Sequence, residues 1–417
     1  MPVSAFGLFN HRGLFTQACL LLLLLANAPA HAATKDLTCR LTEQLTASFA
    51  NRTESLEALA ISGGGSRGAW GAGFLSGWRG NLPAQERPFD LVTGVSVGAL
   101  LATHAYLGLY AEEEDGPQRL NEIFLELTNR QVRRRRVRFV WTLAADSTHS
   151  NARLAKTLRR VITEELLLRV NERQQQDPGL LCVTTVNLRS GGLVRWDLTR
   201  IATDFAAAQG ESRAALLDLY RNLLLAATAI PGVFSPQEIS FDSAQYTVEN
   251  SVSGDRHIDS GVRNQVVGPA PPATQAEDLY DDEYGMLFGE MMENEAPPPK
   301  VYLLINADPV LPASQDIRVG PFPVLAVAAR SLLIILNQSA KSSRERVQAQ
   351  AREFNATCQA VAMRPTDLQP TTCKAYARSG ARSNAPLEAL EFNCSRELFG
   401  FGQARGRSVE WQACESL

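Results

Sequence analysis

The sequence has no excess of charge of either sign. Its 41 lysines and arginines nearly balance its 44 aspartates and glutamates, which leaves a formal net charge of −3. Proteins that bind nucleic acid usually carry a strong basic bias, so we expect no nucleic-acid partner. The hydrophobic fraction of 45% and the charged fraction of 20% are ordinary for a globular protein with a sizeable core.

A long hydrophobic run is missing at the N-terminus. The apolar stretch that contains Leu20–Leu25 falls short of the ~20 residues that span a bilayer. A basic start at His11 and Arg12, this short stretch and the small residues Ala30 and Ala32 are typical of a secretory signal peptide. We expect cleavage after Ala32, with a site two residues earlier as the alternative, rather than an uncleaved anchor. The mature protein is then expected in the periplasm, at the outer membrane or outside the cell.

Cysteine is sparse, and one of the seven, Cys19, lies within the predicted signal peptide. In an exported protein the others can form disulfides. Four of them fall in the last 60 residues, a polar and weakly periodic region that we expect to be held by disulfides rather than by a core of its own. Cys182 lies in an apolar run and can equally be a buried free thiol. The disulfide candidates are Cys39, Cys358, Cys373, Cys394 and Cys414.

Strand-like apolar runs alternate with helical stretches along the chain. The predicted strands are 56–62, 89–93, 180–188, 192–198 and 300–306, and the predicted helices are 97–112, 154–168, 214–229 and 324–351. The alternation argues for an α/β fold with a mainly parallel sheet covered on both faces. The first half of the last helix is apolar but too short to span a bilayer, so we expect it to pack in the core.

One serine lies on a predicted junction between a strand and a helix, in Gly94-Val95-Ser96-Val97-Gly98. A serine on such a tight turn needs glycine on both sides, because a Cβ there would clash with the strained backbone. The turn exposes the hydroxyl, and the N-terminus of the following helix places positive partial charge near a developing oxyanion. The pattern alone is weak, but its position between strand and helix makes Ser96 a candidate nucleophile.

A glycine-rich loop, Gly63-Gly64-Gly65-Ser66-Arg67-Gly68, directly follows the first predicted strand. Consecutive glycines let backbone N–H groups converge on an anion, as in an oxyanion hole or a phosphate nest. The same residues spell Gly-x-Gly-x-x-Gly, so a dinucleotide site is a competing interpretation. Its ribose-binding acid would be Glu86 or Asp90. Neither is well placed at a strand end, and a nucleotide site leaves the serine turn unexplained.

An aspartate stands before small residues in Asp259-Ser260-Gly261, which suits a carboxylate held in a loop; a simple Asx-turn is the structural alternative. The small number of histidines limits which residue can act as the base of a serine hydrolase. A hydrolase with the order serine, acid, histidine needs a histidine after its acid, and none follows Asp259. Only His257, with an earlier acid such as Asp204 or Asp242, can complete such a triad.

Taken together, these segments resemble the patatin-like phospholipase family, which pairs a glycine-rich oxyanion loop and Gly-x-Ser-x-Gly with a later Asp-Gly-Gly or Asp-Gly-Ala. Order and spacing agree over about 56–306, and 227–236 also resembles the family's stretch before the acid. Ser260 replaces a glycine of the acid motif and Ser62 stands where the family often has an acid, but no catalytic group is lost. The resemblance implies a three-layer α/β/α fold and no metal or other cofactor.

Carried over residue by residue, the resemblance implies a dyad in which Ser96 is the nucleophile and Asp259 the general base. Backbone amides around Gly64, Gly65 and Ser66 would stabilise the oxyanion, with Arg67 steadying the loop. A carboxylate that takes the serine proton directly should lie within about 3 Å of Oγ. The implied activity is acyl-ester hydrolysis on lipids, of the phospholipase A type. The alternative from another class is a non-catalytic lipid-binding protein that keeps the fold.

A basic run at 130–138 precedes Phe139-Val140-Trp141. Such a segment can rest on anionic headgroups while its aromatic residues enter the membrane interface, although a solvated charge run is the alternative. Between Gly268 and Pro299 the composition changes to proline, acid, tyrosine and methionine, which predicts a flexible insertion. We therefore expect a signal peptide at 1–32, a patatin-like domain at 33–353 with an insertion at 268–299, and a Cys-rich C-terminal extension at 354–417.

Overall fold

The computed structural model of the chain describes residues 34–40, 54–86, 88–110, 124, 134–135, 147–268, 297–306, 323–353, 355–363 and 394–416. The predicted signal peptide, most of the basic run and most of the predicted insertion lie outside these ranges. No helix within them is long and apolar enough to cross a membrane.

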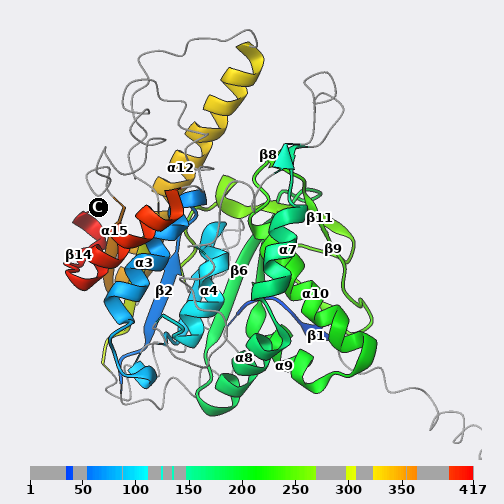
Figure 1. The fold of residues 1–417 in the computed structure, drawn as a ribbon, viewed down its shortest axis with the longest axis horizontal. Coiled ribbons are helices and arrows are strands. Elements are labelled where there is room, and N and C mark those ends of the chain that lie inside the picture. The colour runs from blue at the N-terminus through cyan, green and yellow to red at the C-terminus, as the bar shows by residue number, and fades with distance from the viewer. Residues whose placement is uncertain are drawn as a thin grey trace, which may run out of the picture.

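A central mixed sheet organises the described chain (Figure 1). Its strands are β2 (Glu57–Ile61), β3 (Leu91–Gly94), β6 (Leu180–Asn187), β7 (Leu193–Asp197), β9 (Gln237–Ile239), β11 (Asp255–Asp259), β12 (Lys300–Ile305), β13 (Thr357–Ala362) and β14 (Gln412–Ala413). They follow the order β14-β13-β12-β2-β3-β6-β11-β9, with β7 paired to β6 off this path. The strands from β13 to β6 run parallel, and the other pairings are antiparallel.

Helices and short strands complete the fold. The helices are α3 (Gly68–Arg79), α4 (Val97–Leu107), α7 (Ala152–Val161), α8 (Glu164–Gln176), α9 (Leu198–Ala207), α10 (Gly210–Ala227), α12 (Pro323–Glu353) and α15 (Ser395–Arg407). The 3-10 turns are η1 (Gly65–Arg67), η2 (Ala84–Glu86), η4 (Ser260–Val262) and η7 (Cys414–Ser416). One small sheet pairs β1 (Lys35–Asp36) with β10 (Tyr246–Thr247), and another joins β4 (Arg134–Arg135), β5 (Ser147–Ser150) and β8 (Gly232–Phe234).

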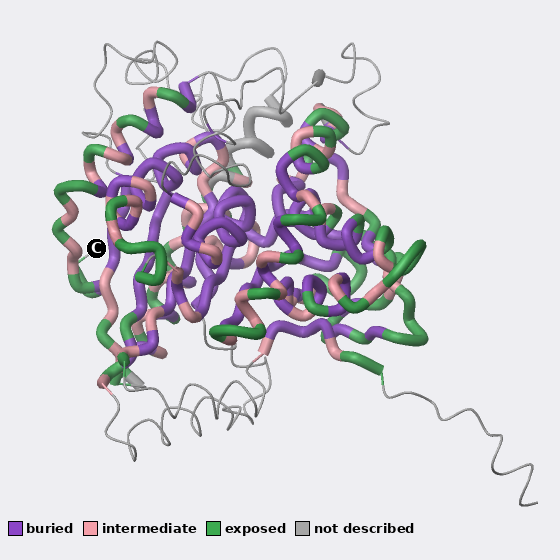
Figure 2. Tube along the Cα trace, turned by 60° about the horizontal axis from the view of Figure 1, so that its bottom comes forward, coloured by how far each residue is buried: buried purple, intermediate pink, exposed green. Residues whose placement is uncertain are grey.

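The middle of the molecule is buried (Figure 2), and apolar clusters lie against both faces of the central sheet. Successive side chains of a strand point to opposite faces, so Leu59 and Ile61 of β2 pack with the helices α3 and α4, whereas Ala58 and Ala60 join a second apolar cluster with Val347 of α12. Strands covered on both sides read as continuous apolar runs, which is why β2 and β6 are visible in the sequence. The fold is a three-layer α/β fold with a mainly parallel sheet, and this prediction is confirmed.

Close packing of α3 and α15 depends on glycine in both helices (Figure 1). A Cβ at Gly73 of α3 would collide with the backbone carbonyl of Phe399, and one at Gly402 of α15 would collide with that of Trp70. Only glycine lets two backbones approach this closely. The segment that begins directly after the glycine loop is therefore held by a helix from the far end of the chain.

The region predicted as a C-terminal extension is built into the same sheet and core wherever the structure describes it. β13 pairs with β12 and β14 pairs with β13. Leu398 and Phe399 of α15 are buried in the large apolar cluster that contains the helices around the sheet. Disulfides add to this packing rather than replace it.

Two disulfides are described completely. Cys358 of β13 is bonded to Cys414, with Cα atoms 5.5 Å apart, and Cys39 is bonded to Cys182 of β6, with Cα atoms 5.8 Å apart. The interpretation of Cys182 as a free thiol is therefore wrong. The segment of Cys39 runs antiparallel beside β7, the neighbour of β6, where the N–H of Cys39 donates to Arg195 O at 3.0 Å. Cys394 is also disulfide-bonded. Cys373 lies outside the described residues.

The long helix predicted over 324–351 is α12, but its expected core packing is wrong in part. Its C-terminal half packs on the sheet and on the loop after β11, where Ser343 Oγ accepts from Val266 N–H at 3.3 Å. Ile334 and Ile335 are 51% and 50% exposed, because this part of the helix projects beyond the sheet (Figure 1).

Candidate active site

Ser96 lies on a sharp turn between β3 and α4. Its backbone has φ 54° and ψ −125°, in a region that residues with a Cβ rarely adopt. A Cβ on Gly94 would lie 2.5 Å from Gly98 O, and one on Gly98 would lie 2.5 Å from Ile61 O, so both glycines of the pattern are needed for the turn. Backbone strain of this kind costs free energy and is concentrated at functional sites.

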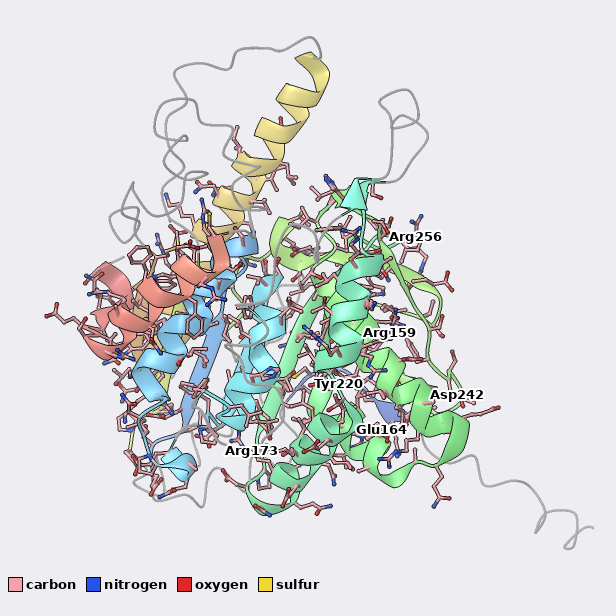
Figure 3. The ribbon with its side chains drawn as sticks, viewed as in Figure 1. Arg159, Glu164, Arg173, Tyr220, Asp242 and Arg256 are labelled. Atoms are coloured by element: carbon pink, nitrogen blue, oxygen red, sulfur yellow. A yellow bond between two sulfur atoms is a disulfide. The ribbon has the colours of Figure 1, made fainter. Side chains whose placement is uncertain are left out.

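The helix behind Ser96 is fixed in the core at its far end. Arg173 of α8 donates to the backbone carbonyls of Tyr106 and Phe89, and the second of these bonds measures 2.9 Å (Figure 3). Tyr220 of α10 shares a buried hydrogen bond of 2.8 Å with Thr103 of α4 (Figure 3). With α4 anchored in this way, the turn that carries Ser96 has a rigid base.

Asp259 is brought to Ser96 by β11, which runs antiparallel to β6 and ends at this residue. Ser96 Oγ donates to Asp259 Oδ2 at 2.5 Å, and Gly261 N–H donates to Asp259 Oδ1 at 2.8 Å. The N–H of Asp259 donates to Ala229 O at 3.0 Å, which ties the aspartate to the end of α10. The two residues are 163 positions apart in the sequence, and they lie within the distance that direct proton transfer requires.

Burial changes the acidity of this aspartate. The side chain is almost inaccessible to solvent, and the loss of solvation raises the pKa of Asp259 to about 7. Hydrogen bonds from Ser96 and Gly261 favour the charged form and offset only part of this rise. A carboxylate with a pKa near neutrality accepts a proton more readily than an ordinary solvated aspartate.

The glycine loop after β2 lies beside Ser96, because a Cβ on Gly63 would be 3.2 Å from Ser96 Cβ. The N–H of Gly63 donates to Gln265 O at 3.0 Å, that of Arg67 donates to Gly64 O at 3.3 Å, and that of Gly68 bonds back to the turn itself. Within the described part of the chain, the N–H groups of Gly64 and Gly65 have no protein acceptor. Of the six predicted loop residues, these two therefore have amides available to an anion.

Arg67, expected to steady the loop, lies at its end with a buried Nε that has no hydrogen-bond partner among the described residues. The contact that holds the loop comes from Asn306, directly after β12. Its N–H and Nδ2 donate to Ser62 Oγ at 2.9 Å and Ser62 O at 2.8 Å. A Cβ on Gly64 would lie 2.7 Å from Asn306 Cβ, so the asparagine supports the glycine from behind.

Sequence reasoning missed Asn306 and Gln265. The signal for Asn306 was available, because a polar residue at the carboxyl end of a parallel strand faces the usual site of an α/β sheet. Gln265 gives no such signal. Its backbone oxygen binds Gly63, and its side-chain Nε2 donates to Gly261 O at 3.1 Å, so it joins the glycine loop to the acid motif.

His257 does not complete a triad in this structure. Its ring is buried between Thr185 Oγ1 and Ser251 Oγ, each at 2.9 Å, and makes no hydrogen bond to Ser96. Burial lowers the pKa of His257 to about 4, so the ring is neutral at ordinary pH. Asp204 is paired instead with Lys35 at 2.6 Å, and Asp242 is exposed at the edge of the molecule (Figure 3).

The structure places neither candidate for the ribose-binding acid of a dinucleotide site next to the glycine loop. Glu86 is exposed in η2. Asp90 precedes β3 and accepts from Glu57 N–H at 2.8 Å, at the start of β2 and β3 rather than at the end that carries the glycine loop. Neither carboxylate faces the loop. No group of three or more histidine, cysteine, aspartate or glutamate side chains that could hold a metal occurs in the described ranges.

The model of the family described as patatin-like phospholipase matches residues 59–270, which is just over half of the chain. The chain belongs to the patatin-like phospholipase family. The matched segment of this patatin-like protein includes the glycine loop, the turn of Ser96 and the strand of Asp259, and it ends before β12, α12, β13 and α15. Membership supports lipid acyl hydrolase activity in general.

Other comparisons add little to this assignment. No curated protein sequence matches the patatin-like chain. Among solved structures it is similar to VipD from Legionella pneumophila, with 13% sequence identity and a TM-score of 0.29 over 91% of this chain and 72% of that chain. A similarity at this level says nothing about the site.

Proposed function

We propose that this protein hydrolyses acyl esters of lipids, of the phospholipase A type, with Ser96 as nucleophile and Asp259 as general base. The observation that carries the proposal is the hydrogen bond of 2.5 Å from Ser96 Oγ to Asp259 Oδ2. This bond joins a serine in a strained backbone conformation directly to a buried carboxylate, with no histidine between the two side chains. Family membership supports the lipid class of the substrate.

In the acylation step, Ser96 Oγ attacks the ester carbonyl carbon while its proton passes to Asp259 Oδ2. The carbonyl oxygen becomes an oxyanion, which the N–H groups of Gly64 and Gly65 stabilise by hydrogen bonds. When the oxyanion collapses, the bond to the leaving alcohol breaks and Asp259 returns the proton to that oxygen. Water then hydrolyses the acyl-enzyme by the same sequence, with Asp259 again as base.

A non-catalytic lipid-binding protein is the second candidate. The backbone of Ser96 at φ 54° argues against it, because a binding protein gains nothing from holding a serine in a strained turn.

Export through a signal peptide remains part of the proposal. The two complete disulfides support it, because such bonds form and persist in oxidising compartments. The proposal includes a periplasmic, outer-membrane or extracellular destination. Peripheral membrane contact through the basic run at 130–138 is proposed on its sequence alone.

The test of the function combines an active-site label with a lipid panel. A fluorophosphonate probe is expected to label the wild type covalently at Ser96, and Ser96→Ala is expected to remove the label. The two proteins are then incubated with phospholipids and acylglycerols, and released fatty acids are measured by mass spectrometry. A labelled wild type that releases fatty acid from no lipid would contradict the lipid class, and an unlabelled wild type would contradict the serine hydrolase.

The rate of hydrolysis is expected to depend on pH with an acid limb near pH 7. Burial raises the pKa of Asp259 to about 7, and only its ionised form accepts the proton of Ser96. The value of kcat/KM should therefore rise as the pH passes through about 7 and level off above it. Initial rates with p-nitrophenyl butyrate across this range test it. A midpoint at about 4, the pKa of a solvated aspartate, would show that the base is not buried during catalysis.

A further inference from the structure

The carboxamide of Gln265 fills a space beside the dyad that two glycines leave open. A Cβ on Gly63 would collide with Gln265 Oε1 and lie 3.2 Å from Ser96 Cβ. A Cβ on Gly261 would lie 2.7 Å from Gln265 Nε2 and 3.1 Å from Asp259 Oδ1. The glycine loop and the acid motif therefore both lack a side chain at the place where this carboxamide lies.

One hydrogen bond decides which end of the carboxamide faces Ser96. Gln265 Nε2 donates to Gly261 O at 3.1 Å, and a carbonyl oxygen cannot pair in this way with Oε1. Oε1 is thereby turned towards Gly63 and Ser96. Over the described ranges no N–H or O–H group donates to this oxygen, and the residue is only half-buried. The site thus holds a fixed acceptor that a small molecule can reach.

We infer that Gln265 Oε1 holds the water that hydrolyses the acyl-enzyme, an inference that rests on the function proposed above. A water molecule that attacks an acyl-enzyme has two O–H groups to direct. One points to Asp259, which accepts the proton. The other is free to point to Oε1, and this second hydrogen bond turns a lone pair of the water towards the acyl carbon.

The step balances without any further reagent. The water oxygen forms a bond to the acyl carbon, one water hydrogen passes to Asp259 Oδ2, and the carbonyl oxygen becomes the oxyanion. When the oxyanion collapses, the bond between the acyl carbon and Ser96 Oγ breaks, and Asp259 returns the proton to Oγ. The second water hydrogen stays on its oxygen and leaves with the carboxylic acid. Gln265 neither gains nor loses a proton in this step.

A purely structural role is the alternative, because Gln265 also joins two loops. Its backbone oxygen accepts from Gly63 N–H at 3.0 Å, and every side-chain variant keeps this bond. A change of the side chain alone therefore separates the carboxamide from the backbone contact. Methionine matches the length and flexibility of glutamine and offers only a weak sulfur acceptor, so Gln265→Met is the informative variant.

Methanol as a competing nucleophile separates the two roles. Methanol has a single O–H group, and this group points to Asp259, which accepts its proton. Methanol therefore has no second O–H group to donate to Gln265 Oε1 when it attacks the acyl-enzyme. In Gln265→Met we expect hydrolysis of the acyl-enzyme to slow roughly tenfold, the usual effect of losing one such hydrogen bond. Acylation and methanolysis should stay near the wild-type rates. The ratio of methyl ester to free acid, at one methanol concentration, should then rise about tenfold.

The experiment follows the burst of p-nitrophenol from p-nitrophenyl butyrate and measures both acyl products. A folded Gln265→Met that slows water and methanol equally, or that leaves the ratio unchanged, overturns the inference. Gln265→Leu has a similar volume and replaces the methionine variant if the latter does not fold. A wild type that releases p-nitrophenol no faster than Ser96→Ala would contradict the proposed function itself, so the two failures are distinct.

Discussion

Replacing Asp259 with asparagine is expected to lower kcat for ester hydrolysis by roughly 10²- to 10⁴-fold, the usual contribution of a general base. Asparagine keeps the shape of the side chain, and its Oδ1 can still accept from Gly261 N–H, a bond of 2.8 Å in this structure. It cannot accept the proton of Ser96. The rates are measured with p-nitrophenyl butyrate and with any lipid that the wild type cleaves.

The stability of the same variant provides the control for folding. The pKa of Asp259 is raised in the folded protein, so the group favours folding most at low pH, and this contribution is lost as the pH rises from about 4 to about 7. Asp259→Asn removes the ionisable group. Its Tm above pH 7 is therefore expected to be no lower than that of the wild type, although its activity is lost.

Asp255 is the matched control on the same strand. It is buried four residues earlier, and it accepts from Arg189 Nε at 2.7 Å rather than from any residue of the dyad. Asp255→Asn is expected to lower Tm while the folded protein keeps its kcat. Full activity in Asp259→Asn would remove the aspartate from the mechanism. Loss in both variants would point to a general effect of β11.

Gly64→Ala is expected to lower kcat by roughly 10²- to 10³-fold, as the loss of an oxyanion donor does in other hydrolases. The new Cβ would lie 2.7 Å from Asn306 Cβ and 3.1 Å from the Asn306 backbone, so the loop must move away from β12. This displaces the N–H groups of Gly64 and Gly65 from the oxyanion. KM should change little, because the ground-state ester depends less on these bonds than the transition state.

Gly400→Ala is the control for this second substitution. A Cβ at Gly400 of α15 would meet nothing within 4 Å, and alanine is the better helix former. The variant should keep both Tm and kcat. Wild-type kcat in a folded Gly64→Ala would show that the glycine loop does not stabilise the transition state.

Strands were predictable where burial on both faces makes them apolar. β2, β3, β6 and β12 are such strands, and all four coincide with predicted runs. β11 is not visible as an apolar run, because its sequence Asp-Arg-His-Ile-Asp is polar and its buried polar side chains depend on partners such as Thr185 and Ser251. β13 was missed because its six residues lie in a region that is polar on average, so they do not stand out as an apolar run.

The helix α3 escaped prediction for a different reason. Its four glycines, at 68, 71, 73 and 77, oppose helix formation when each residue is judged alone. The structure places Gly73 and Gly77 against the backbone of α15, so tertiary contact outweighs local preference. No pattern within the segment contains that information, because the partner lies more than 300 residues away.

The residues of the site were also predictable only in part. Ser96, Asp259 and the glycine loop are visible as motifs, and the structure brings them together, while their catalytic roles stay predictions. Asn306 and Gln265 belong to no motif. Asn306 is marked only by its place at the end of a strand, and Gln265 is marked by nothing in the sequence, because its role depends on contacts with Gly63 and Gly261. A glycine in a motif indicates that another group packs closely against the backbone, but the motif does not identify that group.

The pairing of β12 with β2 has a consequence for biosynthesis. Ser62, beside the glycine loop, is hydrogen-bonded to Asn306, which is 244 residues further along the chain. On the ribosome, β2 and the loop emerge long before their partner strand and must wait with an open edge that can pair with other chains. Contacts this distant also slow folding. A fragment that stops at residue 270, where the family match ends, is therefore expected to aggregate rather than fold.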